Sequence, residues 1–184
     1  MKKLLFILLF VSALFAAWYW EKQSISNASF ETTSGAVDDT LDNTFDGWTK
    51  VGTGIVDATA DAVDGSLAFK GYCNANNAYL YKLIKVEPFA VYKLTFWYKL
   101  TTTGTPQYRI YDVTNATDII SWTVLPNTGS WTKVTVYFST FSGTNGTNEI
   151  YLYLGSPGTY TLNFLFDSVQ LGIRKYKKSA WSKW

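Results

Sequence analysis

Short runs of alternating or purely apolar residues fill the chain from Ile25 onward, and turn-forming residues separate them roughly every 8–15 positions. No stretch of helical period interrupts this pattern. Such spacing is typical of a sandwich or barrel, so we predict an all-β domain built as an antiparallel β-sandwich, preceded by an N-terminal hydrophobic helix or signal segment. The predicted strands are Ile25–Glu31, Trp48–Val51, Ser66–Tyr72, Ala78–Val86, Tyr92–Leu100, Gln107–Asp112, Ile119–Thr123, Trp131–Phe138, Glu149–Leu154 and Asn163–Leu171.

Alternation within these strands predicts which side chains face the core, because successive residues of a strand point to opposite faces. In Glu149–Leu154 the aliphatic residues alternate with Tyr151 and Tyr153. In Gln107–Asp112, Tyr108 and Ile110 alternate with Arg109 and Tyr111. A solvated face usually carries Thr, Ser, Lys and Glu, so these tyrosines and the arginine indicate a face that contacts something.

Composition excludes several kinds of chemistry. The 184 residues contain no histidine and one cysteine, Cys73. A serine or cysteine nucleophile activated by histidine is therefore excluded, as is a His/Cys zinc or copper site, and no internal disulfide can form. Residues 24–173 carry 8 Lys+Arg against 13 Asp+Glu, and the basic residues concentrate in the tail, 174–184. This layout argues against a nucleic-acid partner, which requires basic residues clustered on the folded surface.

Residues 1–23 form a leader, with Lys2 and Lys3 followed by an apolar run from Leu4 to Trp20. It fits a secretory signal peptide, although cleavage after Ala16 or Ala17 would leave a large residue at the −3 position. It also fits a retained membrane anchor, in which residues 4–20 contact the bilayer and Trp18–Trp20 lie at its interface. In either case the domain is exported, so we expect it to be extracellular or on a cell or virion surface, where the N-terminal segment would anchor it if retained.

Several motifs follow one another in an order that resembles a known group of domains. They are similar to carbohydrate-binding module families 4, 9 and 22, within the galactose-binding-like jelly rolls, and the resemblance covers roughly residues 25–172. It implies a non-catalytic, glycan-binding jelly roll. The motifs are Asn27–Glu31, Gly47-Trp48, Asp64–Phe69, Ile84–Pro88, Tyr92–Tyr98, Ser130–Lys133 and Phe166–Leu171.

The resemblance also implies a sugar-binding groove on one sheet face. Arg109, Tyr153 and Lys82 align with polar groove positions of the family, although a lysine in place of the usual amide at Lys82 departs from its pattern. Tyr111 and Tyr151 share that face by strand parity, and Trp122 lies on a segment that often edges the cleft. Aromatic rings stack on the apolar faces of sugars while polar side chains bind their hydroxyls. These rings would equally suit packing under loops or against a neighbouring subunit.

A structural calcium ion is implied by the same resemblance. Its ligands would be the carboxylates of Glu31 and Asp167 together with carbonyl oxygens near Ser29 and Gly65, which are the oxygen donors that calcium prefers. The alternative is that both acids are ordinary turn-capping or solvated residues. Trp48 and Trp131 lie in motifs that close the sandwich, and we assign them to structure.

Two functional hypotheses remain open at this stage. The first is a non-catalytic carbohydrate-binding module displayed outside a cell or particle, with a glycan as its partner. The second is a structural subunit of a surface assembly, such as a virion coat, spike or filament, in which neighbouring copies pack as a homo-oligomer. Catalysis by a pair of carboxylates requires no histidine, but no acid pair stands out apart from the loop and calcium candidates, so we expect no enzyme activity.

Overall fold

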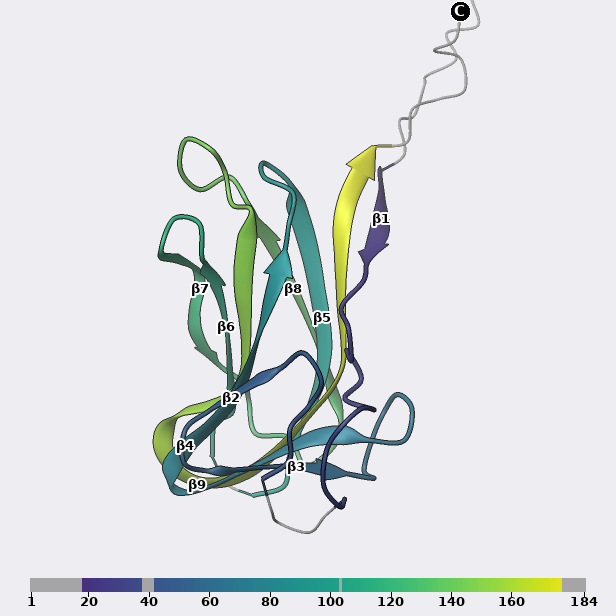
Figure 1. The fold of residues 1–184 in the computed structure, drawn as a ribbon, viewed down its shortest axis with the longest axis vertical. Helices are drawn as coiled ribbons and strands as arrows, with labels where there is room; N and C mark the ends of the chain where they lie inside the picture. The colour runs from purple at the N-terminus through teal and green to yellow at the C-terminus, as the bar shows by residue number, and fades with distance from the viewer. Residues whose placement is uncertain (1–17, 38–41, 103, 177–184) are drawn as a thin grey trace, which may run out of the picture.

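The computed structural model describes residues 18–37, 42–102 and 104–176, and this part of the chain is all β. Two strands are unusually long and organise the rest: β4 (Ala68–Lys85) and β9 (Glu149–Tyr176). They pair antiparallel along most of their length and bend together, so that each contributes to both layers of the sandwich (Figure 1). The remaining strands are β1 (Trp18–Gln23), β2 (Thr49–Val51), β3 (Ile55–Thr59), β5 (Val91–Leu100), β6 (Gln107–Asp112), β7 (Thr117–Val124) and β8 (Thr132–Ser139).

The first layer is built on the second half of β4 and the first half of β9. β2 pairs with β4 on one side, and β6 followed by β7 extends the layer from β9 on the other. We call this layer the first sheet. The second sheet uses the first half of β4 and the second half of β9, flanked by β3 on one side and by β5 and β8 on the other.

The bend lies where β4 and β9 cross from one sheet to the other. Register shifts at Asn74–Asn76 and Asn76–Ala78 mark the irregular backbone of β4, and such bulges bend a strand. Opposite, Gly155 of β9 has φ of 141°, and a Cβ there would lie 2.5 Å from the carbonyl oxygen of Ala78. Glycine is therefore required where the two strands approach each other at the corner.

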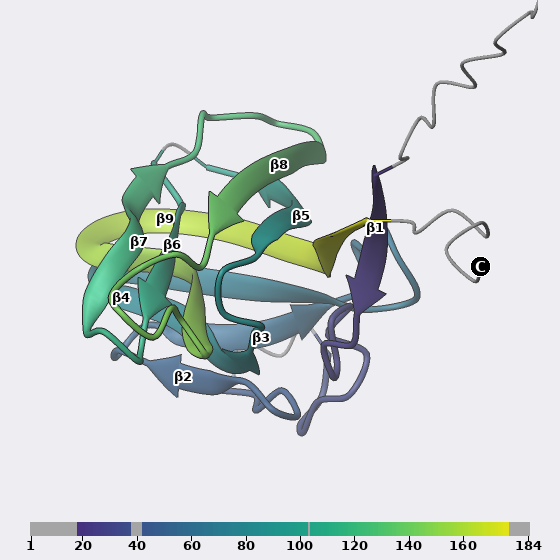
Figure 2. The ribbon, with the colours of Figure 1, turned by 90° about the horizontal axis from the view of Figure 1, so that it is seen from above.

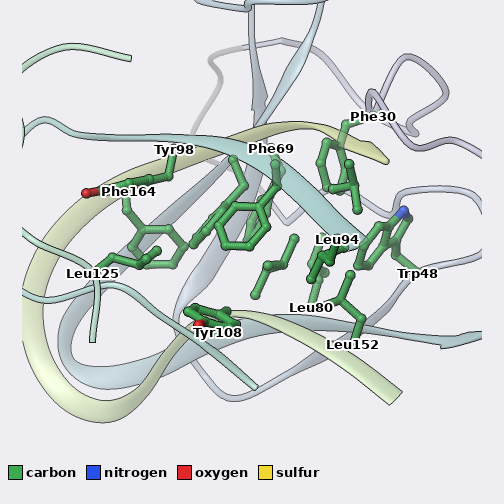
Figure 3. Packing of buried hydrophobic residues seen from close by; sticks show 14 of the residues in the cluster. Phe30, Trp48, Phe69, Leu80, Leu94, Tyr98, Tyr108, Leu125, Leu152 and Phe164 are labelled. Carbon is green, nitrogen blue, oxygen red and sulfur yellow. The ribbon is translucent and has the colours of Figure 1, made fainter. Parts of the chain in front are cut away.

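The core between the sheets is rich in phenylalanine. Phe69 of β4 packs edge-on against Phe164 and stacks on Phe166, both of β9, at ring-centre distances of 5.7 and 6.1 Å. Phe30 covers one end of this cluster together with Trp48, and their ring centres are 5.0 Å apart (Figure 3). The predicted structural role of Trp48 agrees with this position, because its ring is buried and its Nε1–H donates to the Asn27 carbonyl oxygen.

The prediction of an all-β, antiparallel sandwich is confirmed, but several boundaries differ. The strand predicted for Ile25–Glu31 is wrong: the segment is irregular, and Asn27 and Phe30 have positive φ. β3 was missed because Ile55–Thr59 mixes apolar and polar residues. The four strands predicted within Ala68–Lys85 and Glu149–Tyr176 form two continuous strands, β4 and β9. Their backbone pairing continues through the bend, where the local sequence contains turn-forming residues.

The junction between leader and domain also differs from the prediction. Trp18–Gln23, which we placed with the leader, form β1 and pair antiparallel with residues 171–176 at the end of β9 (Figures 1 and 2). Arg174 and Lys175, placed with the tail, likewise belong to this pair. The hydrophobic helix or signal segment expected over residues 1–17, and the tail from 177, lie outside the described residues. No helix in the described part of the chain is long and apolar enough to span a membrane.

Candidate functional site

The outer face of the first sheet carries the side chains that alternation singled out. Arg109 and Tyr111 on β6 lie directly opposite Tyr153 and Tyr151 on β9 in the strand register. The residues between them, Ile110 and Leu152 among them, are buried in the core. The predicted separation of an aliphatic inner face from a tyrosine-bearing outer face is therefore present in the structure.

Two further tyrosines, which sequence reasoning missed, complete this face. Tyr79 and Tyr81 alternate on β4 with the buried Leu80, and this alternation is the signal that could have found them. The Tyr81 ring lies 5.0 Å from Tyr151 and 5.5 Å from Tyr153. We use the name "tyrosine face" for the resulting surface, which consists of Tyr79, Tyr81, Arg109, Tyr111, Trp122, Tyr151 and Tyr153.

Trp122 of β7 joins the tyrosine face from its far edge. Its ring centre lies 5.4 Å from that of Tyr79 and 5.5 Å from that of Tyr153. Tyr153 thereby contacts rings of two other strands, β4 and β7, as well as Tyr151 of its own strand, and burial among them raises the pKa of its phenol. The rings are half-buried and support one another edge to face, so they form a continuous platform held in place before any ligand arrives.

Arg109 supplies the positive charge on this platform. Its guanidinium carbon lies 4.7 Å from the centre of the Tyr111 ring and 5.4 Å from that of Tyr153. Its Nε–H donates to an Asp118 carboxylate oxygen at 2.6 Å. A guanidinium has five N–H donors, so others remain available to bind hydroxyl groups beside the rings. The platform can thus offer apolar ring surface and polar donors to the same ligand.

The rings of the tyrosine face extend over several strands, since contacts join Tyr79 and Tyr81 of β4, Tyr151 and Tyr153 of β9 and Trp122 of β7. Three surface hollows, of about 400, 330 and 210 Å³, lie on other parts of the described surface, and none of them is lined by these rings. A row of rings of this extent suits a ligand that lies along it, such as a chain.

Lys82 was predicted for the sugar site, and the structure corrects that placement. Lys82 has the strand parity of Leu80 and Ile84, so it points to the inner side of β4, away from Tyr81. Its side chain is only 6% exposed, and its ammonium donates to Ser26 Oγ at 2.9 Å and to the Gly47 carbonyl oxygen at 2.8 Å. Burial lowers its pKa. Lys82 contacts the N-terminal segment at Ser26 and the turn at Gly47, and it does not contribute to the tyrosine face.

The residues proposed to bind calcium converge at a different place, where the N-terminal segment meets the loop before β4. Asp167 is fully buried and accepts backbone N–H donors from Val63 at 2.7 Å and Asp64 at 2.9 Å. Glu31 accepts from the backbone N–H groups of Ser66 and Leu67 in the same loop. Burial removes water from the Asp167 carboxyl and raises its pKa, although these backbone donors act in the opposite direction. The charged form of Asp167 is therefore less favourable here than in water.

The donors at this place suit a hard cation such as calcium. Ser29 Oγ lies 2.9 Å and Ser168 Oγ 3.3 Å from an Asp64 carboxylate oxygen, so two hydroxyl oxygens and a third carboxylate lie on the same segments as Glu31 and Asp167. Phe30, Gly65 and Ser168 of these segments have positive φ. The described part of the chain contains no cluster of three or more His, Cys, Asp or Glu side chains placed to hold a metal, so neutral oxygens would have to complete the coordination.

Trp131, assigned to structure, lies just before β8 of the second sheet. Its Nε1–H donates to an Asp61 carboxylate oxygen, and the same acid pairs with Lys99. It thereby connects the start of β8 to the loop between β3 and β4.

A family model described as a carbohydrate binding domain matches residues 22–161, which is most of the chain. The chain therefore belongs to that family, and the resemblance drawn from its motifs is confirmed. No curated protein matches the sequence.

Solved structures share the fold at low sequence identity. A carbohydrate-binding module solved in complex with β-1,4-galactotriose has a TM-score of 0.56 at 13% identity, covering 80% of this chain and 95% of that one. A Stig cyclase from Fischerella has a TM-score of 0.64 at 18% identity, covering 87% and 100%. The enzymatically active domain of the bacteriophage CBA120 tailspike protein 4 has a TM-score of 0.58 at 16% identity, covering 70% of this chain, which spans 19% of that one.

Proposed function

We propose that this member of the carbohydrate-binding domain family binds a glycan chain along the tyrosine face without catalysing a reaction on it. The observation that carries the proposal is a single platform of mutually supporting aromatic rings with a guanidinium among them, on the outer face of a sheet whose inner face is core. Family membership supports the ligand class, since this family is one of carbohydrate-binding domains.

Sugars suit this surface for a physical reason. A pyranose presents apolar C–H groups on its faces and hydroxyl groups around its edge. The rings of Tyr81, Tyr153 and Trp122 offer apolar surface to the former, and they lose little side-chain entropy on binding because they already pack against one another. The phenol O–H groups and Arg109 offer hydrogen bonds to the latter.

A calcium ion held by Glu31 and Asp167, with oxygens of Ser29 and Gly65, is part of the same proposal. When bound, it would supply positive charge that compensates the buried Asp167 carboxylate. It would link the N-terminal segment, the loop at residues 63–67 and β9, which already meet here through backbone donors. Its role would be structural, because the tyrosine face belongs to the other sheet.

We place this activity outside the cell, on a cell or particle surface. The support is the apolar leader, Leu4–Trp20, which precedes the domain after two lysines. β1 begins within this run, at Trp18, so any cleavage or membrane exit that leaves the fold intact has to lie before it.

The test is a glycan array followed by titration calorimetry on the glycans that bind. Tyr81→Ala and Trp122→Ala should each weaken binding at least about tenfold, as is typical when a central ring is removed from a contact. Tyr19→Ala is the matched control, because this ring is 46% exposed on β1 and lies outside the tyrosine face. Melting curves confirm that each variant is folded.

Sedimentation analysis of the same proteins tests assembly, which is the competing use of this face. Concentration-dependent oligomers that dissociate in Tyr81→Ala and Trp122→Ala, in a protein that binds no glycan, would overturn the proposal and assign the rings to subunit packing.

A further inference from the structure

The outer face of the second sheet, remote from the tyrosine face, contains a hollow of about 210 Å³. Gly172 of β9 lies in it, paired on one side with Lys22 of β1 and on the other with Lys93 of β5. Because glycine has no side chain, the Trp20 side chain lies close over this position, and the hollow opens beside it. A Cβ at Gly172 would meet Trp20 at 3.5 Å, an ordinary contact distance, so packing does not require a glycine here.

Aromatic rings border this hollow. Trp20 of β1 is 36% exposed, and its ring centre lies 5.6 Å from that of Tyr137 on β8, which is 61% exposed. Trp20 therefore reaches across β9 and β5 beside the glycine. Trp97 of β5 lies in the next part of the same face, and its ring is contacted by Lys133. The face thus combines exposed aromatic surface with an open floor.

Positive charge is concentrated in the same place. Lys22, Lys93 and Lys133 all line the hollow, together with the amide of Gln170. None of the three lysines forms an ion pair with a carboxylate of the described residues, whereas Lys50, Lys70, Lys99, Arg109 and Lys175 all do. Lys93 Nζ lies 5.3 Å from the Trp20 ring centre and Lys133 Nζ 5.8 Å from the Trp97 ring centre. Three ammonium groups therefore surround one small hollow without a counter-charge.

We propose that this hollow is a second ligand site, which binds an acidic sugar unit of an anionic glycan. The carboxylate or sulfate group of the sugar is held by Lys93, Lys133 and Lys22, while its ring lies against Trp20. The proposal does not depend on glycan binding at the tyrosine face, because the two sites share no residue and lie on different sheets.

Charge distribution favours an acidic sugar over other polyanions. The three lysines surround one hollow rather than forming a stripe that would follow a phosphate backbone. A membrane surface would contact a broad plane, whereas the hollow is sized for about one sugar residue.

The experiment measures binding of three oligosaccharides of equal length to the full chain: an oligogalacturonate, a sulfated galactan and neutral β-1,4-galactan. The wild type should bind at least one anionic oligomer at least about tenfold more tightly than the neutral one, and the preferred oligomer identifies carboxylate or sulfate as the group recognised. Lys93→Gln and Lys133→Gln should each weaken that binding about tenfold, since a hydrogen bond to a charged group contributes that much or more. Lys85→Gln, which removes an exposed lysine from the other sheet, should leave it unchanged.

Gly172→Val tests the hollow by filling it, with a residue that strands accommodate well. It should abolish binding of the anionic oligomer with an unchanged melting temperature; if it unfolds, the two lysine variants carry the test. Equal affinity for the neutral oligomer, or binding lost in Arg109→Ala but retained in Lys93→Gln, would overturn the proposal. So would a single-stranded DNA oligonucleotide that binds as tightly as the anionic sugar with the same lysine dependence.

Discussion

Arg109 and Tyr153 face each other across β6 and β9, with the guanidinium carbon 5.4 Å from the centre of the tyrosine ring. Asp118 fixes the same guanidinium from the neighbouring strand β7 through its Nε–H. The arginine is therefore positioned both by a carboxylate and by ring surface. A flexible side chain so constrained loses less entropy when a ligand binds, so it should contribute more to affinity than its partial exposure suggests.

Arg109→Lys should show whether glycan binding depends on the planar shape of the guanidinium or only on its positive charge. Lysine keeps the positive charge but lacks the planar donors that lie over Tyr111 and Tyr153. We expect about tenfold weaker glycan binding, measured by calorimetry, with stability changed by less than about 1 kcal/mol because the ion pair with Asp118 is partly exposed. Arg109→Lys binding as tightly as the wild type would show that charge alone matters.

Strand parity accounts for most of what could be foreseen about the tyrosine face. Tyr151 and Tyr153 alternate with leucines along β9, and a period of two is a local property that a sequence displays directly. The same rule places Lys82 beside Leu80 and Ile84 on the inner face, which contradicts the groove position that the resemblance to the family implies. The local sequence does not show which groups would accept hydrogen bonds from a buried lysine. The acceptors, Ser26 and Gly47, are distant in sequence and meet Lys82 only in the folded chain.

Non-local pairing accounts for what could not be foreseen. β1 forms because Trp18–Gln23 pair with residues 171–176 of β9, which lie at the other end of the chain. Nothing in the local pattern of Trp18–Gln23 distinguishes a strand from the end of an apolar leader. The aromatic and basic residues around Gly172 were likewise scattered over β1, β5, β8 and β9, and only the sheet order brings them together.

Removal of β1 tests its contribution. A chain that starts at Trp18 should fold with the stability of the full domain, whereas one that starts at Ser24 leaves the edge of β9 unpaired and removes the packing of Trp20 on Tyr137. We expect the shorter chain to melt several degrees lower and to aggregate more readily, because an exposed edge strand pairs with other molecules. Identical melting curves for the two chains would show that β1 adds nothing to the stability of the domain.

Calcium binding predicts a response to chelator. Addition of calcium at a hundred times its dissociation constant should stabilise the domain by about 2.7 kcal/mol, which corresponds to about 5–10 °C in melting temperature. Asp167→Asn and Glu31→Gln should abolish the response, and Asp46→Asn, an exposed acid outside the cluster, should keep it. A chelator that leaves the wild-type melting curve unchanged would argue that backbone donors alone satisfy Asp167.

Asp112 should contribute stability that is lost in acid. Burial alone raises the pKa of this carboxyl, but hydrogen bonds from Thr147 and Asn115 outweigh it and hold the pKa below its usual value. The unfolded chain then takes up a proton before the folded one, so the contribution is complete above about pH 3.9 and decreases as pH falls towards the lowered pKa. Asp112→Asn should cost about 1–3 kcal/mol at pH 7 and progressively less below pH 4.

Urea unfolding of Asp112→Asn at pH 7 and pH 3 measures this difference. Asp118→Asn is the control, since its ion pair is exposed enough to contribute only about 0–1 kcal/mol. A cost at Asp112 that is the same at both pH values would assign it to packing rather than to charge.

Lys82 should also make the free energy of unfolding rise with pH, but in the alkaline range and because the charged form is disfavoured in the folded state. Burial lowers its pKa, so between that lowered value and the unfolded value of 10.5 the unfolded chain binds more protons than the folded one. The free energy of unfolding therefore rises with pH across this window. The Lys82 ammonium lies among neutral groups, namely the Ser26 hydroxyl, the Gly47 carbonyl oxygen and the Trp48 ring, and no carboxylate of the described residues forms an ion pair with it.

Lys82→Met removes this charge while preserving an unbranched chain that can pack against Trp48. We expect the variant to be as stable as the wild type or up to about 2 kcal/mol more stable at pH 7, because replacing a buried charge by an apolar side chain is often neutral or stabilising. Its advantage should shrink as pH rises towards 10, because the lysine loses its proton in the folded state at lower pH than in the unfolded chain. Denaturant unfolding at pH 7 and pH 10 measures both values, with Lys85→Met as the exposed control on the same strand. A large loss of stability at pH 7 would show instead that the bonds to Ser26 and Gly47 outweigh the desolvation of the ammonium, and that this lysine is what fastens the N-terminal segment to the sheet.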